Sequence, residues 1–399
     1  MHMRLLFLFL LGPLSAWCQA WYRLPDFPGS KRDDGVAVTV NQTLYAGTGL
    51  QEGWSATIDF YAFDLLSMQW KPIPTMPHTT ERQYGCAFAG PNCFFVFGGE
   101  GVGGALNNLY KYDIASATWS LMASKPGKGL LAASCMAFGD TVVIAGGKVA
   151  GPGPLNQEVW QYILSKNTWE KKADLPFAPR WRASSAVLNQ KGYLIFGIDS
   201  LNAFRKDIYR YDLTNDSWQK IADFPSQHGR AYAGMASTGK RLVVFGGVDS
   251  LANLYNDVWY YNDANNTWIQ EANLPASPRK GGMMGAIGNR VVYTCGIDGS
   301  GRLNESWMSD IPLGISEERH TNALVVYPNP CQDKITLSNN SQEEVLQIRL
   351  RNMLSQEVMA LQMYRLNDVM DISFLPNGMY WLEWVNRNNQ KGVLKLIKN

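Results

Sequence analysis

The chain has few of the residues on which metal sites and nucleophile–base pairs depend. It holds 4 histidines and 6 cysteines in 399 residues, and none of them cluster at the spacing of a zinc site. It also has no glycine-rich phosphate loop and no nucleophile elbow. We therefore expect no metal, no cofactor and no catalytic residue, and a binding role before an enzymatic one.

The chain also has little net charge and no long apolar run. Its formal net charge of +2 provides no general attraction to nucleic acid or to an anionic membrane. The apolar run at residues 5–11 is too short to cross a bilayer, and no other run approaches that length. We therefore expect no nucleic-acid partner and no transmembrane segment.

This short apolar run has the features of a secretory signal. Arg4 precedes it, and Cys18 and Ala20 are small residues at the cleavage-recognition positions. We predict a signal peptide at residues 1–20, and hence a bacterial protein that is secreted or held on the cell surface. A lipoprotein anchor on Cys18 is the alternative, which the bulk of Trp17 disfavours.

Five cysteines follow the predicted signal peptide. An odd, scattered set is not a disulfide framework, so we interpret them mainly as small buried apolar residues. Cys86 and Cys93 flank the turn at residues 90–92 and can pair, unless a slip in register places them on opposite faces.

Tryptophan recurs through most of the chain at intervals of 49 or 50 residues. The series is Trp21, Trp70, Trp119, Trp169, Trp218 and Trp268. Aromatic residues stand nine and seven positions before each of the later five, and an apolar run that ends in glycine follows each tryptophan. A repeat of this length predicts a propeller or a solenoid.

These marks resemble the kelch repeat, whose units fold as blades of a β-propeller. In the second unit the marks are a strand ending in a glycine pair at residues 94–99, an aromatic pair within residues 110–113, and Trp119. The resemblance extends from residue 21 to about residue 312. It implies an all-β fold and is weak as a guide to activity.

Six such units can be counted, each with the pattern of four short strands. The last unit has no tryptophan near position 317, whereas the mature chain begins with an unpaired strand at residues 21–24. We predict a six-bladed propeller at residues 21–314, closed by this N-terminal strand, with the tryptophans as wedges between blades. The glycine pair is intact in three units and altered in three, with substitutes Thr48, Ile198 and Ile297.

The segment after the repeats has a different pattern. Residues 315–322 are predicted to be a linker, and residues 323–399 a small β-sandwich of about seven short strands. Residues 326–330, residues 375–380 and the basic tail at 391–398 resemble a type A sorting domain of the bacterial type IX secretion system. The resemblance implies export across both membranes, with the secretion machinery as partner. An ordinary accessory sandwich is the alternative.

A cation stands near the start of every innermost strand, and a second set of residues follows each glycine run. The first set is Arg32, Arg82, Lys128, Arg180, Arg230 and Arg279, and the second is Gly49, Glu100, Lys148, Asp199, Asp249 and Asp298. Strand parity places both sets on the face with the long loops, where a rigid scaffold usually carries its binding site. We predict two touching rings around the channel mouth, with the ion pairs Arg82–Glu100, Arg230–Asp249 and Arg279–Asp298.

Blades three and four break this pattern. Lys128 is expected to face Lys148 without an acid, and Arg180 and Arg182 stand on either side of Trp181. A guanidinium can grip an anion while an aromatic ring stacks on the apolar face of the ligand. We therefore predict that these five residues bind an anionic glycan or peptide. The resemblance supports this prediction, because kelch propellers that bind acidic partners use arginine at this position.

Three functions are compatible with these observations. The first, which we predict, is a secreted or surface-displayed module that binds a protein or an anionic ligand on its long-loop face. The second is implied by the resemblance, because some six-bladed kelch proteins are sialate mutarotases, and Glu100 or Glu52 would then serve as acid or base. The third is a purely structural or adhesive surface protein.

Overall fold

The computed structural model describes residues 21–150, 153–310, 325–338, 345–354, 356–361, 369–386 and 391–399. The predicted signal peptide and linker lie outside these residues. All the regular elements within these residues are β-strands, so the predicted all-β class is confirmed. The chain forms two compact units, one built from the repeats and one from the C-terminal segment.

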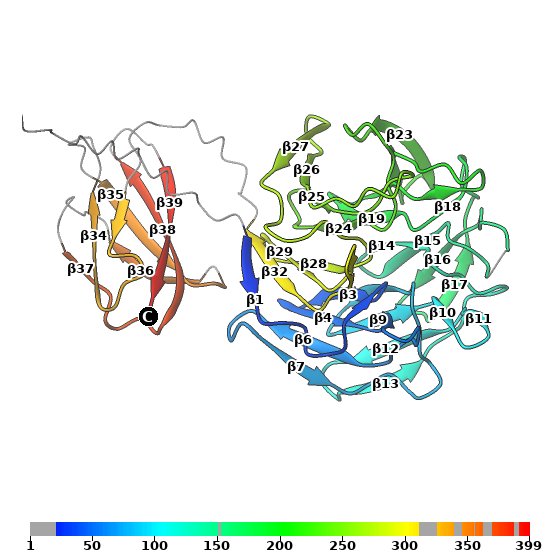
Figure 1. Cartoon of the computed structure of the whole chain (residues 1–399), viewed down its shortest axis with the longest axis horizontal. Coiled ribbons are helices and arrows are strands. Elements are labelled where there is room, and N and C mark those ends of the chain that lie inside the picture. The colour runs from blue at the N-terminus through cyan, green and yellow to red at the C-terminus, as the bar shows by residue number, and fades with distance from the viewer. Residues whose placement is uncertain are drawn as a thin grey trace, which may run out of the picture. The chain divides into compact units, whose positions relative to one another are not determined.

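The repeats form six four-stranded antiparallel sheets around a ring (Figure 1). From the inside outwards, blade one holds β3 (Val36–Val40), β4 (Thr43–Gly47), β6 (Phe60–Asp64) and β7 (Gln69–Ile73), and blade two holds β8 (Cys86–Gly90), β9 (Cys93–Phe97), β12 (Leu109–Asp113) and β13 (Thr118–Leu121). In the same order, blade three holds β14 (Ser134–Phe138), β15 (Thr141–Ala145), β16 (Val159–Ile163) and β17 (Thr168–Lys171), and blade four holds β19 (Ser184–Leu188), β20 (Lys191–Ile195), β22 (Asp207–Asp212) and β23 (Ser217–Asp223). Blade five holds β24 (Gly234–Ser237), β25 (Leu242–Phe245), β26 (Val258–Asn262) and β27 (Thr267–Glu271), and blade six holds β28 (Met283–Ile287), β29 (Arg290–Thr294), β32 (Ser306–Asp310) and β1 (Trp21–Leu24).

The N-terminal strand is the outer strand of blade six. β1 pairs antiparallel with β32, with Trp21 opposite Ser309 and Leu24 opposite Ser306. The innermost strands contact one another in the order β3, β8, β14, β19, β24, β28 and back to β3. The first and last parts of the repeat region therefore share one sheet, which removes an open edge from the propeller.

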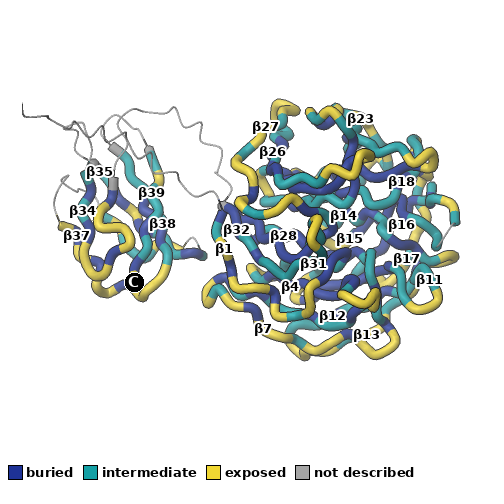
Figure 2. Tube along the Cα trace, in the orientation of Figure 1, coloured by how far each residue is buried: buried dark blue, intermediate teal, exposed yellow. Residues whose placement is uncertain are grey.

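The tryptophans of the repeat pack between blades, as predicted. The Trp119 ring of blade two lies 5.2 Å from the Phe60 ring of blade one, and the Trp169 ring of blade three lies 5.2 Å from the Phe97 ring of blade two. The Trp169 indole N–H also donates a hydrogen bond to the Ala123 carbonyl at 2.7 Å. Figure 2 shows that burial follows the strands, whereas exposed segments are mostly loops.

The sequence analysis misplaced the glycine pair by one residue in three units: the pair lies one residue later in blade one and one residue earlier in blades four and six. Its second position is glycine in every blade, with φ between 86° and 102°: Gly49, Gly99, Gly147, Gly197, Gly247 and Gly296. A Cβ at Gly99 would lie 2.6 Å from the Gln83 carbonyl oxygen, so the backbones leave no room for a side chain. The first position is also left-handed, and there Thr48, Phe196 and Cys295 replace glycine, which corrects the assignment of Ile198 and Ile297.

Short two-stranded sheets lie beside the innermost strands. β2 (Arg32–Asp33) pairs with β5 (Leu50–Gln51), and β18 (Arg180–Trp181) pairs with β21 (Ile198–Asp199). Each joins the segment before an innermost strand to the segment after a second strand. This pairing confirms that the two segments share one face, as strand parity predicted.

The C-terminal unit is a small β-sandwich, as predicted. One sheet has the order β33 (Val325–Tyr327), β34 (Lys334–Ser338), β37 (Val369–Asp371), and the other has the order β36 (Glu357–Leu361), β35 (Val345–Arg351), β38 (Gly378–Asn386), β39 (Lys391–Lys398). Buried apolar residues of both sheets, such as Leu337 and Leu382, form one core. No helix in the described parts of either unit is long and apolar enough to cross a membrane.

Candidate functional site

Five of the six predicted mouth cations are buried braces of the scaffold. Their exposed fractions are 0–2%, and each guanidinium donates to a side-chain oxygen 26 or 27 residues further along the chain. The pairs are Arg32–Asp59, Arg82–Asn108, Arg180–Asp207, Arg230–Asp257 and Arg279–Glu305. Because the partner of Arg82 is a neutral amide, burial lowers the pKa of Arg82 to about 10.

The three predicted ion pairs are therefore wrong. Glu100 accepts a hydrogen bond from Gln83 Nε2 at 3.1 Å, and Asp249 accepts one from the Tyr255 hydroxyl at 2.7 Å. Asp298 accepts hydrogen bonds from the backbone and side chain of Ser300. The carboxylates of Asp249 and Asp298 accept from donors of their own loops, and the buried arginines reach past these loops to the start of the third strand of the blade.

The predicted series is also out of register in blade three. The Gly99 backbone N–H donates to the Leu130 carbonyl. In the next blade the equivalent bond runs from the Gly147 N–H to the Arg180 carbonyl. Leu130 therefore occupies the arginine position. Lys128 lies two residues earlier, on an exposed part of the loop.

A ring of six residues, one from each blade, surrounds the channel mouth and is here called the axial ring. Its members are Asp34, Tyr84, Ala132, Arg182, Tyr232 and Gly281, all with φ between 48° and 65°. Each backbone N–H donates to the carbonyl of the member in the preceding blade, at 2.7–3.2 Å, and Asp34 completes the ring by donating to Gly281. The sequence analysis missed this ring because its members share no residue type, although they recur about 50 residues apart.

Arg182 is the centre of an aromatic cluster on the axial ring. Its guanidinium carbon lies 3.6 Å from the Trp181 ring centroid, 4.0 Å from that of Tyr232 and 5.0 Å from that of Tyr84. Its Nη2 donates to the Tyr84 hydroxyl at 3.0 Å. Arg182 Nε is buried and has no hydrogen-bond partner within the described chain.

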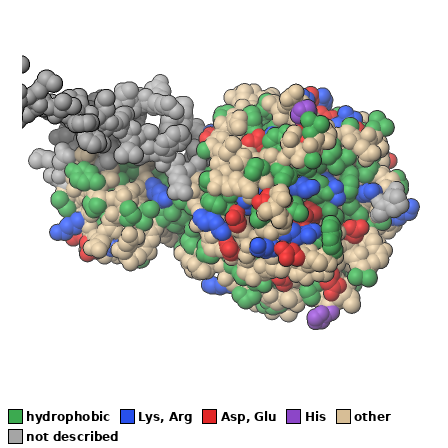
Figure 3. All heavy atoms as spheres, in the orientation of Figure 1, with side chains coloured by type: hydrophobic (Ala, Val, Ile, Leu, Met, Phe, Trp, Pro, Cys, Tyr) green, Lys and Arg blue, Asp and Glu red, His purple; other side chains and the backbone are tan. Residues whose placement is uncertain are grey.

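Two lysines and one acid lie near this cluster. Lys148 Nζ lies 4.9 Å from the Trp181 ring centroid, and Lys280 Nζ lies 4.9 Å from that of Tyr232. Glu100 is close enough to act electrostatically on Arg182. Figure 3 shows basic and acidic side chains close together in the middle of the propeller face in view.

The site strongly perturbs the buried carboxyl of Asp34. Burial and the neighbouring Asp33 raise the pKa of Asp34 well above its ordinary value, although Arg182 and the Tyr84 hydroxyl oppose them. Asp33 itself is held by Arg302, whose Nε lies 2.6 Å from Asp33 Oδ1. Burial and the charge of Asp34 raise the pKa of Tyr84, and burial lowers the pKa of Arg182. Tyr84 thus accepts from Arg182 and lies beside Asp34, whose carboxyl holds a proton at higher pH than a free carboxyl.

The structure brings together three of the five predicted ligand residues: Lys148, Trp181 and Arg182. It places Arg180 in the buried pair with Asp207, and it places Lys128 outside the cluster. Below the axial ring the channel has a volume of about 200 Å³ and is lined by the innermost strands.

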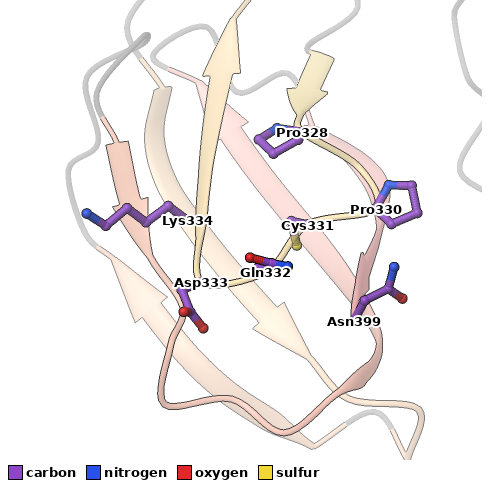
Figure 4. Close-up of a pocket in the computed structure, with 7 residues that line it drawn as sticks. All are labelled: Pro328, Pro330, Cys331, Gln332, Asp333, Lys334 and Asn399. Carbon is purple, nitrogen blue, oxygen red and sulfur yellow. The ribbon is translucent and has the colours of Figure 1, made fainter.

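The C-terminal unit has a separate hollow of about 560 Å³ (Figure 4). It is lined by Pro328, Pro330, Cys331, Gln332, Asp333, Lys334 and Asn399. Nearby, the buried Lys398 ammonium donates to the backbone oxygens of Ile372, Ser373 and Leu375 at 2.7–3.0 Å. These bonds fix the last strand of the chain onto the sandwich.

Three sequence families match parts of the chain. Residues 34–228 match the KLHDC2/KLHL20/DRC7 Kelch-repeats domain, and residues 229–275 match the Kelch motif. Residues 325–399 match the secretion system C-terminal sorting domain.

Individual relatives cover less of the chain. The N-acetylneuraminate epimerase of Haemophilus influenzae (strain PittEE) is 33% identical over 130 residues, which are 31% of this chain and 33% of that protein. The N-acetylneuraminate epimerase of Salmonella arizonae is 25% identical over 215 residues, which are 44% of this chain and 54% of that protein. The chain thus spans between a third and about half of the length of these relatives.

A solved structure described as "Structure of YjhT" shares the fold. It superimposes with a TM-score of 0.59 at 18% sequence identity, and the match covers 71% of this chain and 96% of the other.

Proposed function

Because the chain is a kelch-repeat β-propeller protein with a C-terminal secretion sorting domain, which indicates export, we propose that it binds a small carboxylate-bearing ligand at the channel mouth. An acidic sugar fits this description. The observation that carries the proposal is Arg182, held between aromatic rings with a buried donor, Nε, that lacks a partner in the described chain.

The chemistry of the cluster suits such a ligand. A guanidinium offers a planar pair of donors to a carboxylate, and the stacked rings of Trp181 and Tyr232 hold it in one orientation. Lys148 and Lys280 add positive charge on either side, and the aromatic faces can stack on the apolar face of a sugar.

The loop tips on the same face add apolar surface. Four of the most exposed large apolar side chains of the propeller lie on the hairpins after the glycine pairs: Trp54, Val102, Leu201 and Leu251. Exposed apolar side chains around a polar centre are typical of a binding face.

A second candidate function is catalysis of ring opening in an acidic sugar. Two observations favour it: relatives named N-acetylneuraminate epimerase, and the buried carboxyl of Asp34, whose raised pKa favours the protonated form, beside Tyr84 and Arg182. Asp34 would donate a proton to the ring oxygen while Arg182 holds the carboxylate. Of the predicted acid–base residues, Glu100 lies near Arg182, whereas Glu52 is exposed on a hairpin tip.

Titration calorimetry with N-acetylneuraminate and with a neutral hexose tests the binding proposal. Arg182→Gln should weaken binding of the acidic sugar by roughly 10- to 150-fold, because a hydrogen bond to a charged group contributes about 1.5–3 kcal/mol. Arg210→Gln, on the third strand of blade four and outside the cluster, is the matched control and should bind as the wild type does. Equal affinity of the Arg182 variant, or indifference to salt, would contradict the proposal.

The catalytic candidate has its own measurement. Anomeric exchange of N-acetylneuraminate, followed by NMR, should be faster with the protein than in buffer, and Asp34→Asn should abolish the acceleration while binding persists. Exchange at the buffer rate with wild-type protein, at a concentration that saturates binding, would remove the enzyme and leave the binding protein.

The sorting domain leads to a separate prediction. Deletion of residues 325–399 leaves every propeller sheet intact, so the truncated protein should fold but accumulate in the periplasm. Cell fractionation with an antibody against the propeller measures this. A truncated protein that reaches the medium at the wild-type level would show that the domain is not the export signal.

A further inference from the structure

Side chains at the start of each innermost strand alternate between the two neighbouring blades. The first residue of β19, Ser184, donates from its hydroxyl to Ala233, next to blade five, at 2.7 Å. The second, Ser185, donates to Cys135 in blade three at 2.9 Å. First residues therefore face the following blade, and second residues face the preceding one.

This alternation sets two cysteines against each other between blades two and three. Cys86 is the first residue of β8 and faces blade three, whereas Cys135 is the second residue of β14 and faces blade two. Cys135 Sγ donates to the Ala87 carbonyl of β8 at 3.4 Å, and Cys86 Sγ donates to the Phe97 carbonyl of its own blade at 3.9 Å. Both side chains also line the channel.

The spacing of these positions can be measured at another blade interface. Gly234 and Met284 hold the same two positions between blades five and six, and a Cβ built on Gly234 would lie 3.2 Å from the Met284 Cβ. Disulfides join Cβ atoms roughly 3.5–4.5 Å apart. Because the blades repeat the same geometry, Cys86 and Cys135 need only a few tenths of an ångström of adjustment to reach that range.

The competing partner suggested by the sequence is out of reach. Cys93 pairs across the β8–β9 hairpin with Gly90, which is four residues from Cys86 along the strand. At about 3.3 Å per residue this separation is roughly 13 Å, too far for a disulfide.

We propose that Cys86 and Cys135 form a disulfide bond between blades two and three once the protein is exported. Each thiol loses a proton, and a bond forms between the two sulfurs. The two electrons pass to the disulfide of a thiol–disulfide oxidoreductase of the cell envelope, which becomes a dithiol. The proposal rests on export, since disulfides persist outside the cytoplasm, and it is independent of the ligand.

The reaction is expected as the blades close and not afterwards. Hydrogen bonding to Cys135 and burial raise the pKa of the Cys86 thiol, so little thiolate forms in the folded propeller. Once formed, the bond crosslinks the innermost strands of two neighbouring blades, and it constrains the unfolded chain.

Wild-type protein exported by cells and purified without reductant tests the proposal. Peptide mapping by mass spectrometry should find Cys86 and Cys135 joined, with the loss of two hydrogen atoms. Titration of the denatured protein should find three thiols, that is, the five cysteines of the described chain less these two. Reductant should lower the melting temperature by roughly 5–10 °C.

Two variants separate the bond from a general effect of reductant. Cys86→Ser should have the same melting temperature with and without reductant, whereas Cys93→Ser, the matched control, should keep the linked peptides and the shift. Five free thiols in freshly exported wild-type protein, or a link from Cys86 to any other cysteine, would overturn the proposal whether or not the variants fold.

Discussion

Arg180 and Arg182 stand on either side of Trp181, and the fold uses them in opposite ways. Arg180 is 2% exposed, and its Nη1 donates to Asp207 Oδ1 at 2.7 Å. Arg182 has a left-handed φ of 57°, and its guanidinium contacts the rings of Trp181 and Tyr232 and donates to the Tyr84 hydroxyl. The backbone conformation of a single residue therefore decides whether a cation braces the scaffold or reaches the channel mouth.

The largest expected effect is on the buried member of this pair. Arg180→Leu leaves the Asp207 carboxylate without its partner, so the free energy of unfolding should fall by about 3–5 kcal/mol. The double variant Arg180→Leu with Asp207→Leu should recover most of this loss, because blade three already holds Leu130 at the arginine position. Urea unfolding measures both, and a stable single variant would show that Arg180 is not a brace.

A smaller effect on stability is expected at Arg182. Arg182→Gln removes cation–π contacts and the hydrogen bond to the Tyr84 hydroxyl but breaks no ion pair within hydrogen-bonding distance, so it should cost about 1–2 kcal/mol. The same unfolding experiment applies. A loss as large as that of Arg180→Leu would make Arg182 a second brace and would also explain any loss of ligand binding as unfolding.

The smallest expected effect is a pair of opposite pH dependences. Burial opposes ionisation of Asp207, but its hydrogen bond with Arg180 and the charge of Arg180 outweigh burial and lower the pKa of Asp207. Its contribution to stability is therefore present above about pH 4, the ordinary carboxyl value, and is lost as the pH falls through the lowered pKa. The pKa of Asp34 is raised, so the folded protein should lose stability as the pH rises from about 4 through that raised pKa.

Unfolding midpoints between pH 3 and pH 8 measure these slopes. Asp34→Asn should reduce the loss of stability as the pH rises above 4 and leave the loss below pH 4 unchanged. Asp207→Asn should reduce only the loss of stability as the pH falls below 4. A variant of Asp34 with the wild-type profile would show that its carboxyl titrates normally.

Most of the fold could be predicted because a propeller repeats its chemistry. The tryptophan interval marked the blades, and the missing tryptophan near position 317 matched the unpaired strand at Trp21, which pairs with β32. The glycine pair was misplaced in three units because Thr48, Phe196 and Cys295 adopt the left-handed conformation that glycine normally signals.

Much less of the site could be predicted. Trp181 and Arg182 were identified by their chemistry, but Asp34 and Tyr232 are distant from them in the chain and different in type. Only closure of the ring brings them together, through backbone hydrogen bonds between consecutive blades. Arg180 was misassigned because its carboxylate partner is 27 residues away on the third strand of the blade, a distance that no local pattern reveals.

The amino-acid sequence by itself determined the repeat, the all-β class and the separate C-terminal sandwich, because these follow from local periodicity and from apolar strands that must be covered. The tertiary structure alone decided which charges are paired and which face the channel. Pairing depends on distances of a few ångströms between strands, and a shift of one or two residues in register, as at Lys128 and Leu130, exchanges a buried position for an exposed one.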